Sequence, residues 1–240
     1  MLGPPPPTAS GVTPHLERLG ASKRSACYVP EEGVLLVEHA DKAVGARQST
    51  AHFFLVLRGR SLTTSTIDVC IAVDSEVAYR QGWSSDSWAR DAAEIAETVG
   101  RRVNVDSTIG EFARNFFDQT AFQPGRFDEP YLAQPWDAGF QNPYAPIAYS
   151  LKQYAYRTAH RLPVALTLPQ SNDQIPPALA LSRRVRDSLF AAPVDSAAIR
   201  EVAVRLTSEK ALTFTYHVGG ELFVEIVWDR VSRRFLLVLG

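Results

Sequence analysis

The sequence predicts an α+β fold in which two antiparallel three-stranded β-meanders, one near each terminus, flank a helical middle rich in aromatic residues and proline. Strand-length apolar segments lie near both ends, helical periodicity dominates between them, and no internal repeat of fixed period occurs. Hydrophobic residues make up 45% and charged residues 21% of the 240 residues. This balance is typical of a globular protein with one compact core.

The domain organisation predicted from composition is an arm followed by one domain. Residues 1–29 begin with four consecutive prolines, Pro4 to Pro7, which favour an extended polyproline II segment without internal hydrogen bonds. We expect a flexible, proline-rich arm over residues 1–29 and a single α+β domain over residues 30–240. The arm is also a candidate secondary contact with a partner.

Three strands are expected in the first meander, over residues 34–37, 51–57 and 67–73. The second is almost continuously apolar, as in a strand covered on both faces. In the third, Ile67, Val69, Ile71 and Val73 alternate with less apolar residues, which indicates a half-buried strand.

Two helices are expected next. One carries Trp88 and Ile95 on a shared apolar face, with Ser87 as its N-cap. The other is expected to begin at Ser107 or Thr108, because Thr108 and Glu111 have the spacing of a capping box.

Residues 122–146 combine frequent aromatic residues with interleaved prolines, which disfavour regular structure. We interpret them as a long ordered loop pinned by its aromatic side chains. The loop either covers one face of a sheet or forms a contact surface, since Tyr and Trp dominate interface hot spots. The candidate protein-interface residues are Tyr131, Trp136, Phe140 and Tyr144.

The rest of the chain predicts helices and then the second meander. Helices are expected over residues 147–162, from about residue 173, and from Asp195, with a possible short strand at 164–168. Strands are expected at 212–218, 222–228 and 235–239, the first two joined by Gly219 and Gly220 as a tight hairpin turn. Whether the two meanders form one sheet or two stacked sheets is left open.

The compartment is expected to be cytoplasmic and reducing. No run of about 18 uncharged apolar residues is present, no basic and then apolar leader precedes the domain, and Cys27 and Cys70 are too few for a disulfide framework. One bridge between these two cysteines remains open. Arginine outnumbers lysine about five to one, which is typical of a high-GC host.

Common catalytic motifs are absent from the sequence, including phosphate-binding loops, the nucleophile elbow and zinc signatures. Two dispersed sites are candidates. Asp68 and Asp74 could share a strand face as metal ligands with Glu76. Cys70 could be a nucleophile with His39 or His52 as its base. Solvated acids and a buried structural cysteine are the simpler interpretations, so no cofactor and no metal site are expected.

Arginines form two candidate phosphate-binding clusters. One lies on a predicted helix and the other in the last turn, and their members are Arg183, Arg184, Arg186, Arg230, Arg233 and Arg234. The spacing of Arg183 and Asp187 also predicts an intrahelical ion pair.

The leading functional hypothesis is a non-enzymatic protein–protein interaction, as a structural or regulatory subunit of a larger assembly or through self-association. The missing catalytic motifs, the aromatic loop and the proline-rich arm favour it. The alternative is arginine-mediated nucleic-acid binding, and the weaker alternative is an enzyme with a dispersed site. No membrane partner is expected.

Overall fold

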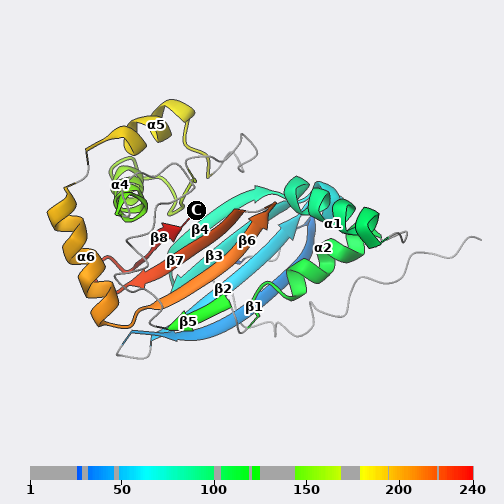
Figure 1. The fold of residues 1–240 in the computed structure, drawn as a ribbon, viewed down its shortest axis with the longest axis horizontal. Coiled ribbons are helices and arrows are strands. Elements are labelled where there is room, and N and C mark those ends of the chain that lie inside the picture. The colour runs from blue at the N-terminus through cyan, green and yellow to red at the C-terminus, as the bar shows by residue number, and fades with distance from the viewer. Residues whose placement is uncertain are drawn as a thin grey trace, which may run out of the picture.

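The computed structural model describes residues 26–28, 32–45, 49–99, 104–118, 121–124, 144–168, 179–193, 195–220 and 222–239. Within these ranges the chain forms two antiparallel four-stranded sheets and several helices, which confirms the α+β class (Figure 1). The first 25 residues of the predicted arm, and most of the predicted aromatic loop with Tyr131, Trp136 and Phe140, lie outside the described residues.

The first sheet is built from consecutive strands in the order β1-β2-β3-β4. Its strands are β1 (Val34–Val44), β2 (Ser49–Arg58), β3 (Thr66–Val73) and β4 (Glu76–Ser84). The sequence predicted the first three, although β1 is longer than expected, but it missed β4. The turn before β4 contains Asp74 and Ser75, both with positive φ (50° and 68°), so the hairpin lacks the glycine that usually marks such a turn.

The second sheet has the order β5-β6-β7-β8. Its strands are β5 (Phe122–Pro124), β6 (Leu212–Gly219), β7 (Leu222–Asp229) and β8 (Arg234–Leu239). The three C-terminal strands and the Gly219–Gly220 turn were predicted, and both glycines have positive φ (128° and 62°). The short β5 was not predicted, because the sequence placed residues 122–124 in the aromatic loop.

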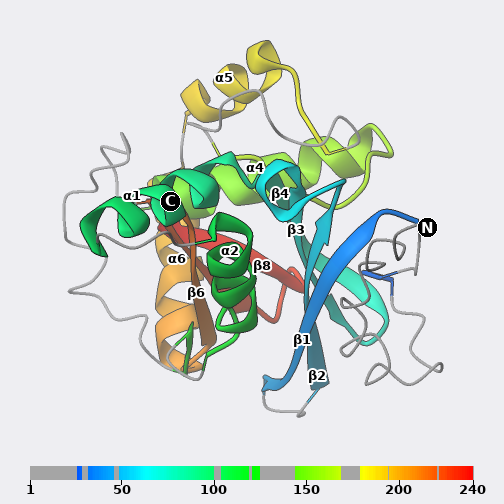
Figure 2. The same cartoon turned by 90° about the vertical axis from the view of Figure 1, so that its right-hand side faces the viewer.

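The two sheets stack face to face through a cluster of aromatic rings. Phe53 of β2 lies at the centre, with its ring centroid 5.0 Å from Phe122, 5.1 Å from Phe214 and 5.8 Å from Phe235. These pairs have the edge-to-face geometry that aromatic rings favour. Figures 1 and 2 show the two layers from perpendicular directions, with β5 over the β1–β2 side and β8 over β4.

The helices cover the ends and sides of this sandwich. They are α1 (Asp86–Val99), α2 (Val105–Arg114), α4 (Ala145–Ala159), α5 (Arg183–Ala191) and α6 (Ser196–Ser208), with a 3₁₀ turn at Leu62–Thr64. Figures 1 and 2 place α1 and α2 at one end, α4 beside β4 and β8, and α5 beyond α4. In the part of the chain that the structure describes, no helix is long and apolar enough to cross a membrane.

The observed first residues of the helices agree only in part with those predicted from the sequence. Asp195 caps α6 as expected, accepting hydrogen bonds from the N–H groups of residues 197 and 198. In contrast, α2 begins earlier than predicted, because Asn104 is its N-cap and Thr108 lies inside the helix. The helix expected from about residue 173 is described only from Arg183, where Ser182 caps it.

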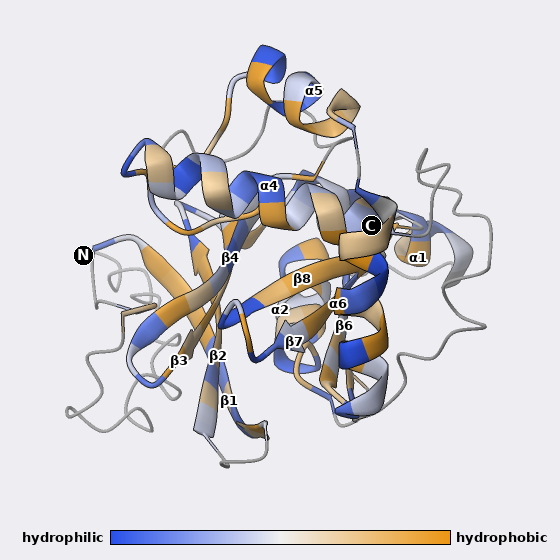
Figure 3. Cartoon of the chain, turned by 90° about the vertical axis from the view of Figure 1, so that its left-hand side faces the viewer, coloured by the Kyte–Doolittle hydropathy of each residue, from blue (hydrophilic) through white to orange (hydrophobic). Residues whose placement is uncertain are grey.

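Packing of α1 onto β6 requires a glycine at one position. Ser87 Oγ donates a 2.6 Å hydrogen bond to the carbonyl of Val218, and Trp88 Nε1 donates to the carbonyl of His217. A Cβ atom on Gly219 would lie 2.2 Å from the Cβ of Ser87, so no larger residue fits there. Figure 3 shows that the strands are largely apolar while the helices carry mixed faces.

Candidate functional site

One lateral side of the sandwich, the α4 side, is closed by specific hydrogen bonds. Strand β8 is the last strand of its sheet, and α4 covers it. Ser150 Oγ of α4 accepts a 2.8 Å hydrogen bond from Leu237 N, and the Tyr154 hydroxyl donates a 2.7 Å bond to the carbonyl of Phe235. Side chains of α4 therefore satisfy backbone groups that an edge strand would otherwise present for further pairing.

The chain after α4 covers β4 on the same side. Leu166 N donates a 2.7 Å hydrogen bond to the carbonyl of Arg80 in β4. Gln153 holds this segment by bonding both the N–H and the carbonyl of Thr167, and the buried Arg157 donates to Thr167 Oγ1. Residues 164–168 therefore do not form the predicted strand, but they make one backbone hydrogen bond to β4 through Leu166.

The opposite lateral side, the β1 side, is built differently. Strand β1 is the terminal strand of the first sheet and pairs with β2; among described residues no further strand pairs with it. Apolar side chains that pack on the core from this side are only half-buried, namely Leu36, Ala40, Phe117 and Ala121. The ammonium group of Lys42 lies 4.3 Å from the centre of the Phe122 ring.

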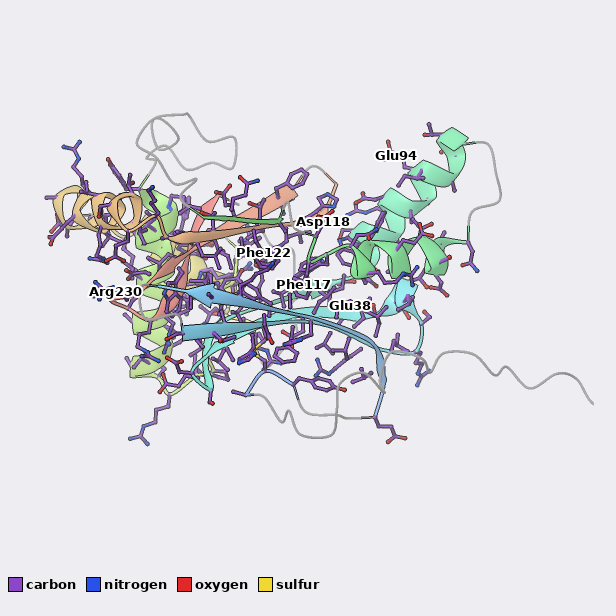
Figure 4. All side chains as sticks on the ribbon, turned by 90° about the horizontal axis from the view of Figure 1, so that it is seen from below. Glu38, Glu94, Phe117, Asp118, Phe122 and Arg230 are labelled. Carbon is purple, nitrogen blue, oxygen red and sulfur yellow. A yellow bond between two sulfur atoms is a disulfide. The ribbon has the colours of Figure 1, made fainter. Side chains whose placement is uncertain are left out.

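Figure 4 looks onto the β1 side and labels residues from both layers there. Glu38 belongs to β1, Phe117 and Asp118 belong to the chain between α2 and β5, and Phe122 is the first residue of β5. Phe117 stacks against Phe122, with ring centroids 6.3 Å apart. The β1 side therefore combines an edge strand, half-buried apolar side chains and charges of both signs.

The predicted aromatic contact surface is only partly described. Tyr144 precedes the first residue of α4, is half-buried and packs against the main core. Its ring therefore contributes to the fold. The proposed contacts of Tyr131, Trp136 and Phe140 remain a prediction, because these residues lie outside the described ranges.

The first arginine cluster does not form one surface. Arg183 and Arg184 are exposed, but Arg186 is buried and interacts electrostatically with the phenol of Tyr149. The expectation that Arg186 contributes to an exposed patch is wrong, because α5 turns this residue toward α4. Arg183 forms the expected pair with Asp187, at 3.8 Å.

The second arginine cluster is engaged in local interactions. Arg230 pairs with Glu209 and Arg233 with Asp74, both at 3.0 Å. Arg234 donates to the carbonyl of Arg233 and lies over the Tyr154 ring, 5.9 Å from its centre. These contacts do not favour this cluster as a phosphate-binding surface.

The carboxylates considered as a metal site lie apart in different environments. Asp68 is buried and paired with Arg80, whose Nη2 atom lies 2.5 Å from Asp68 Oδ2. Asp74 is in the β3–β4 turn, where it accepts from Ser49 and pairs with Arg233. The expectation that Asp68 and Asp74 share one face is therefore wrong.

Cys70 forms a disulfide with Cys27, with the Cα atoms 5.4 Å apart, so the bridge left open by the sequence is present. It lies in a small apolar cluster on the face of the first sheet that points away from the second sheet. Within this cluster the rings of Tyr28 and Phe54 stack 6.2 Å apart. A disulfide sulfur is not a thiolate, so this structure does not support a Cys70–histidine pair.

A buried polar cluster between the sheets was not predicted. The hydroxyls of Tyr79 and Tyr216 lie 2.5 Å apart, and both donate toward Gln81 Oε1. Burial raises the pKa of Tyr79 and of Tyr216 well above the usual range of tyrosine. Because β4 was not recognised, no signal in the sequence placed Tyr79 and Gln81 opposite β6.

No protein family matches this chain, and neither a curated protein nor a solved structure matches it significantly.

Proposed function

We propose that this chain is a protein-binding subunit whose partner docks on the β1 side of the sandwich. The observation that carries the proposal is the contrast between its two lateral sides. The α4 side is closed by hydrogen bonds from Ser150, Tyr154 and residue 166, whereas the β1 side presents an eleven-residue terminal strand and half-buried apolar side chains.

The chemistry of this side fits an extended segment of another protein. A terminal strand offers backbone donors and acceptors to an added strand, and pockets for alternate side chains give such pairing its specificity. An apolar side chain of the partner would pack against Leu36, Ala40 and Phe117, which already contact the core but remain half-buried. Burying them further would stabilise the complex by roughly 25 cal/mol per Å² of apolar surface.

Two alanines of β1 provide matched variants for a test. Ala40 lies opposite Phe53 and faces the second sheet, whereas Ala43 lies opposite Thr50, is exposed and faces away. We expect Ala40→Glu to abolish retention of a protein partner from the native host at moderate salt, because it places a charge among the half-buried apolar side chains. Ala43→Glu adds the same charge on the other face and should retain the partner.

Equal retention by wild type and Ala40→Glu, with unchanged thermal unfolding, would exclude the β1 side as the contact surface. Hydrogen exchange gives a second test on the recovered complex, because amides of β1 should gain protection when a strand is added. In the same capture, Trp136→Ala tests the proposed aromatic contact. Nucleic acid retained only at low salt would instead favour the arginine hypothesis.

A further inference from the structure

Two histidines and an aspartate converge on the outer face of the first sheet. His39 and Asp41 stand two residues apart on β1, and His52 lies directly opposite Asp41 on β2. Asp41 Oδ1 is 2.8 Å from His39 Nε2 and 2.6 Å from His52 Nδ1. All three candidate ligand atoms lie within 4.8 Å of one another.

The sheet register fixes this arrangement. Residues i and i+2 of a strand point to the same face, and the residue paired with one of them across an antiparallel ladder points there too. The ring of His39 packs against Phe54, with centroids 4.7 Å apart, and Phe54 stacks against Tyr28 beside the disulfide. The side chains of His52 and Asp41 are 33% and 41% exposed, so solvent reaches the cluster.

We propose that His39 Nε2, Asp41 Oδ1 and His52 Nδ1 bind one divalent transition-metal ion of the zinc type, with water completing the coordination. Two imidazoles and one carboxylate are a ligand set that zinc accepts, and three protein ligands leave one position open. Imidazole nitrogen favours zinc, copper or nickel over magnesium and calcium, which prefer oxygen ligands. The proposal is independent of the protein-binding function proposed above.

Metal binding requires a rearrangement of the three side chains. Ligand atoms around a tetrahedral zinc ion lie about 3.4 Å apart, since each is about 2.0–2.1 Å from the metal. The two histidine–aspartate distances are 2.8 and 2.6 Å, so side-chain rotations must lengthen them by about 0.6 and 0.8 Å, while the two nitrogens, within 4.8 Å of each other, must also settle about 3.4 Å apart. In each neutral ring the proton must lie on the nitrogen that faces away from Asp41, so that the nitrogen facing Asp41 presents its lone pair to the metal.

Calorimetric titration of the full chain, without a polyhistidine tag, tests the proposal directly. We expect one equivalent of Zn²⁺ to bind in the micromolar range or tighter and to raise the unfolding temperature. Mg²⁺ at the same concentrations should do neither. Co²⁺ provides a spectroscopic probe, because its visible absorption reports nitrogen and oxygen coordination at low coordination number.

Variants of two ligands assign the binding to this cluster. His52→Gln and Asp41→Asn preserve side-chain size, and both should weaken Zn²⁺ binding at least about tenfold, since even loss of an outer-shell partner commonly costs 10- to 100-fold. His160→Gln is the matched control, because His160 is exposed at the end of α4, where its ring bonds the carbonyl of Tyr156. The control should bind Zn²⁺ like the wild type.

Three results would overturn the proposal: no binding of Zn²⁺ tighter than millimolar, unchanged affinity in both His52→Gln and Asp41→Asn, or equal loss in His160→Gln. Chemical unfolding measured in EDTA, which removes bound metal, shows whether a variant has lost only a metal-coordinating side chain or has also lost fold stability. Both ligand variants should then unfold at nearly the same urea concentration as the wild type, because their side chains are partly exposed.

Discussion

Several polar side chains are buried in the fold and hydrogen-bonded there. The hydroxyls of Tyr79 and Tyr216 meet between the sheets, and the Tyr154 hydroxyl bonds the backbone of β8. Each hydroxyl has a partner, so its burial need not leave an unpaired donor. The same burial strongly disfavours ionisation of these phenols.

Alkaline pH should therefore destabilise the protein. Burial raises the pKa of Tyr79, Tyr154 and Tyr216 in the folded state, whereas tyrosines of the unfolded chain titrate near pH 10. Below about pH 10 both states are protonated and this stability is fully present. Above it the unfolded state alone loses protons, so the free energy of unfolding should fall by up to about 1.4 kcal/mol per pH unit for each buried tyrosine.

Urea unfolding at pH 8, 9, 10 and 11 measures this dependence, and tyrosinate absorbance followed in parallel reports ionisation. Ionisation of the buried tyrosines should coincide with unfolding. Their titration near pH 10 in a chain that keeps its native circular dichroism would show that these phenols are accessible to solvent.

The sequence alone predicted where candidate site residues lie along the chain, but it did not predict which residues they contact. The Arg183 and Asp187 pair was predictable because it depends only on helical spacing. Burial of Arg186 was not, because it depends on how α5 packs. The cluster of His39, Asp41 and His52 required the β1–β2 register, which the sequence did not provide because β1 was predicted only over residues 34–37.

At the scale of elements, strands with strong apolar patterns were predicted and those with weak patterns were not. The alternation from Ile67 to Val73 identified β3. Strand β4 contains Arg80, Gln81 and Gly82, which interrupt its pattern, and its preceding turn has no glycine. The early start of α2 was missed because Asn104 caps it without the acidic partner of a capping box.

The closure of β8 by α4 gives a prediction at this scale. Ser150 is fully buried, donates to the carbonyl of Pro146 and accepts from Leu237 N. Ser150→Ala should lower the free energy of unfolding by about 1–3 kcal/mol, because it leaves the N–H of Leu237 buried without its partner. Urea denaturation followed by tryptophan fluorescence measures the loss.

Thr158→Ala is the control for this prediction, since Thr158 is an exposed hydroxyl residue on the same helix. It should change the stability by no more than about 0.5 kcal/mol. A similar small change for Ser150→Ala would mean that the Leu237 amide finds another partner, and that the serine is not needed to close the α4 side.

At the scale of the whole molecule, the disulfide ties the start of the described chain to the centre of the first sheet. Cys27 and Cys70 are 43 residues apart, and closing such a loop stabilises the folded state by about 4 kcal/mol in the chain-entropy model. The paired replacement Cys27→Ala and Cys70→Ala should therefore lower the free energy of unfolding by about 2–4 kcal/mol, as measured by chemical denaturation.

Reduction of the wild-type protein should reproduce this loss, and alkylation of the protein under native conditions should find no free thiol. Thiols that react in protein taken quickly from its host would instead agree with the expected reducing compartment. In that case the paired variant should be nearly as stable as the reduced wild type.

The class of the whole fold was predictable, but its assembly was not. Local periodicity identifies strands and helices, whereas the stacking of the sheets depends on ring contacts such as that of Phe53 with Phe235. These residues are far apart in the sequence, and no short-range pattern records their proximity. The choice between one sheet and two was therefore beyond the sequence.

The two sheets use separate stretches of the sequence: the strands of the first lie between residues 34 and 84, and those of the second between 122 and 239, with α4, α5 and α6 between β5 and β6. Strands can therefore pair within each stretch before the two stretches meet, and their late docking would be the slow event of folding. A chain opened between residues 118 and 121 would yield two fragments, each holding a complete sheet. The ring contacts of Phe53 with Phe122, Phe214 and Phe235 would favour reassembly of the two fragments without a covalent link.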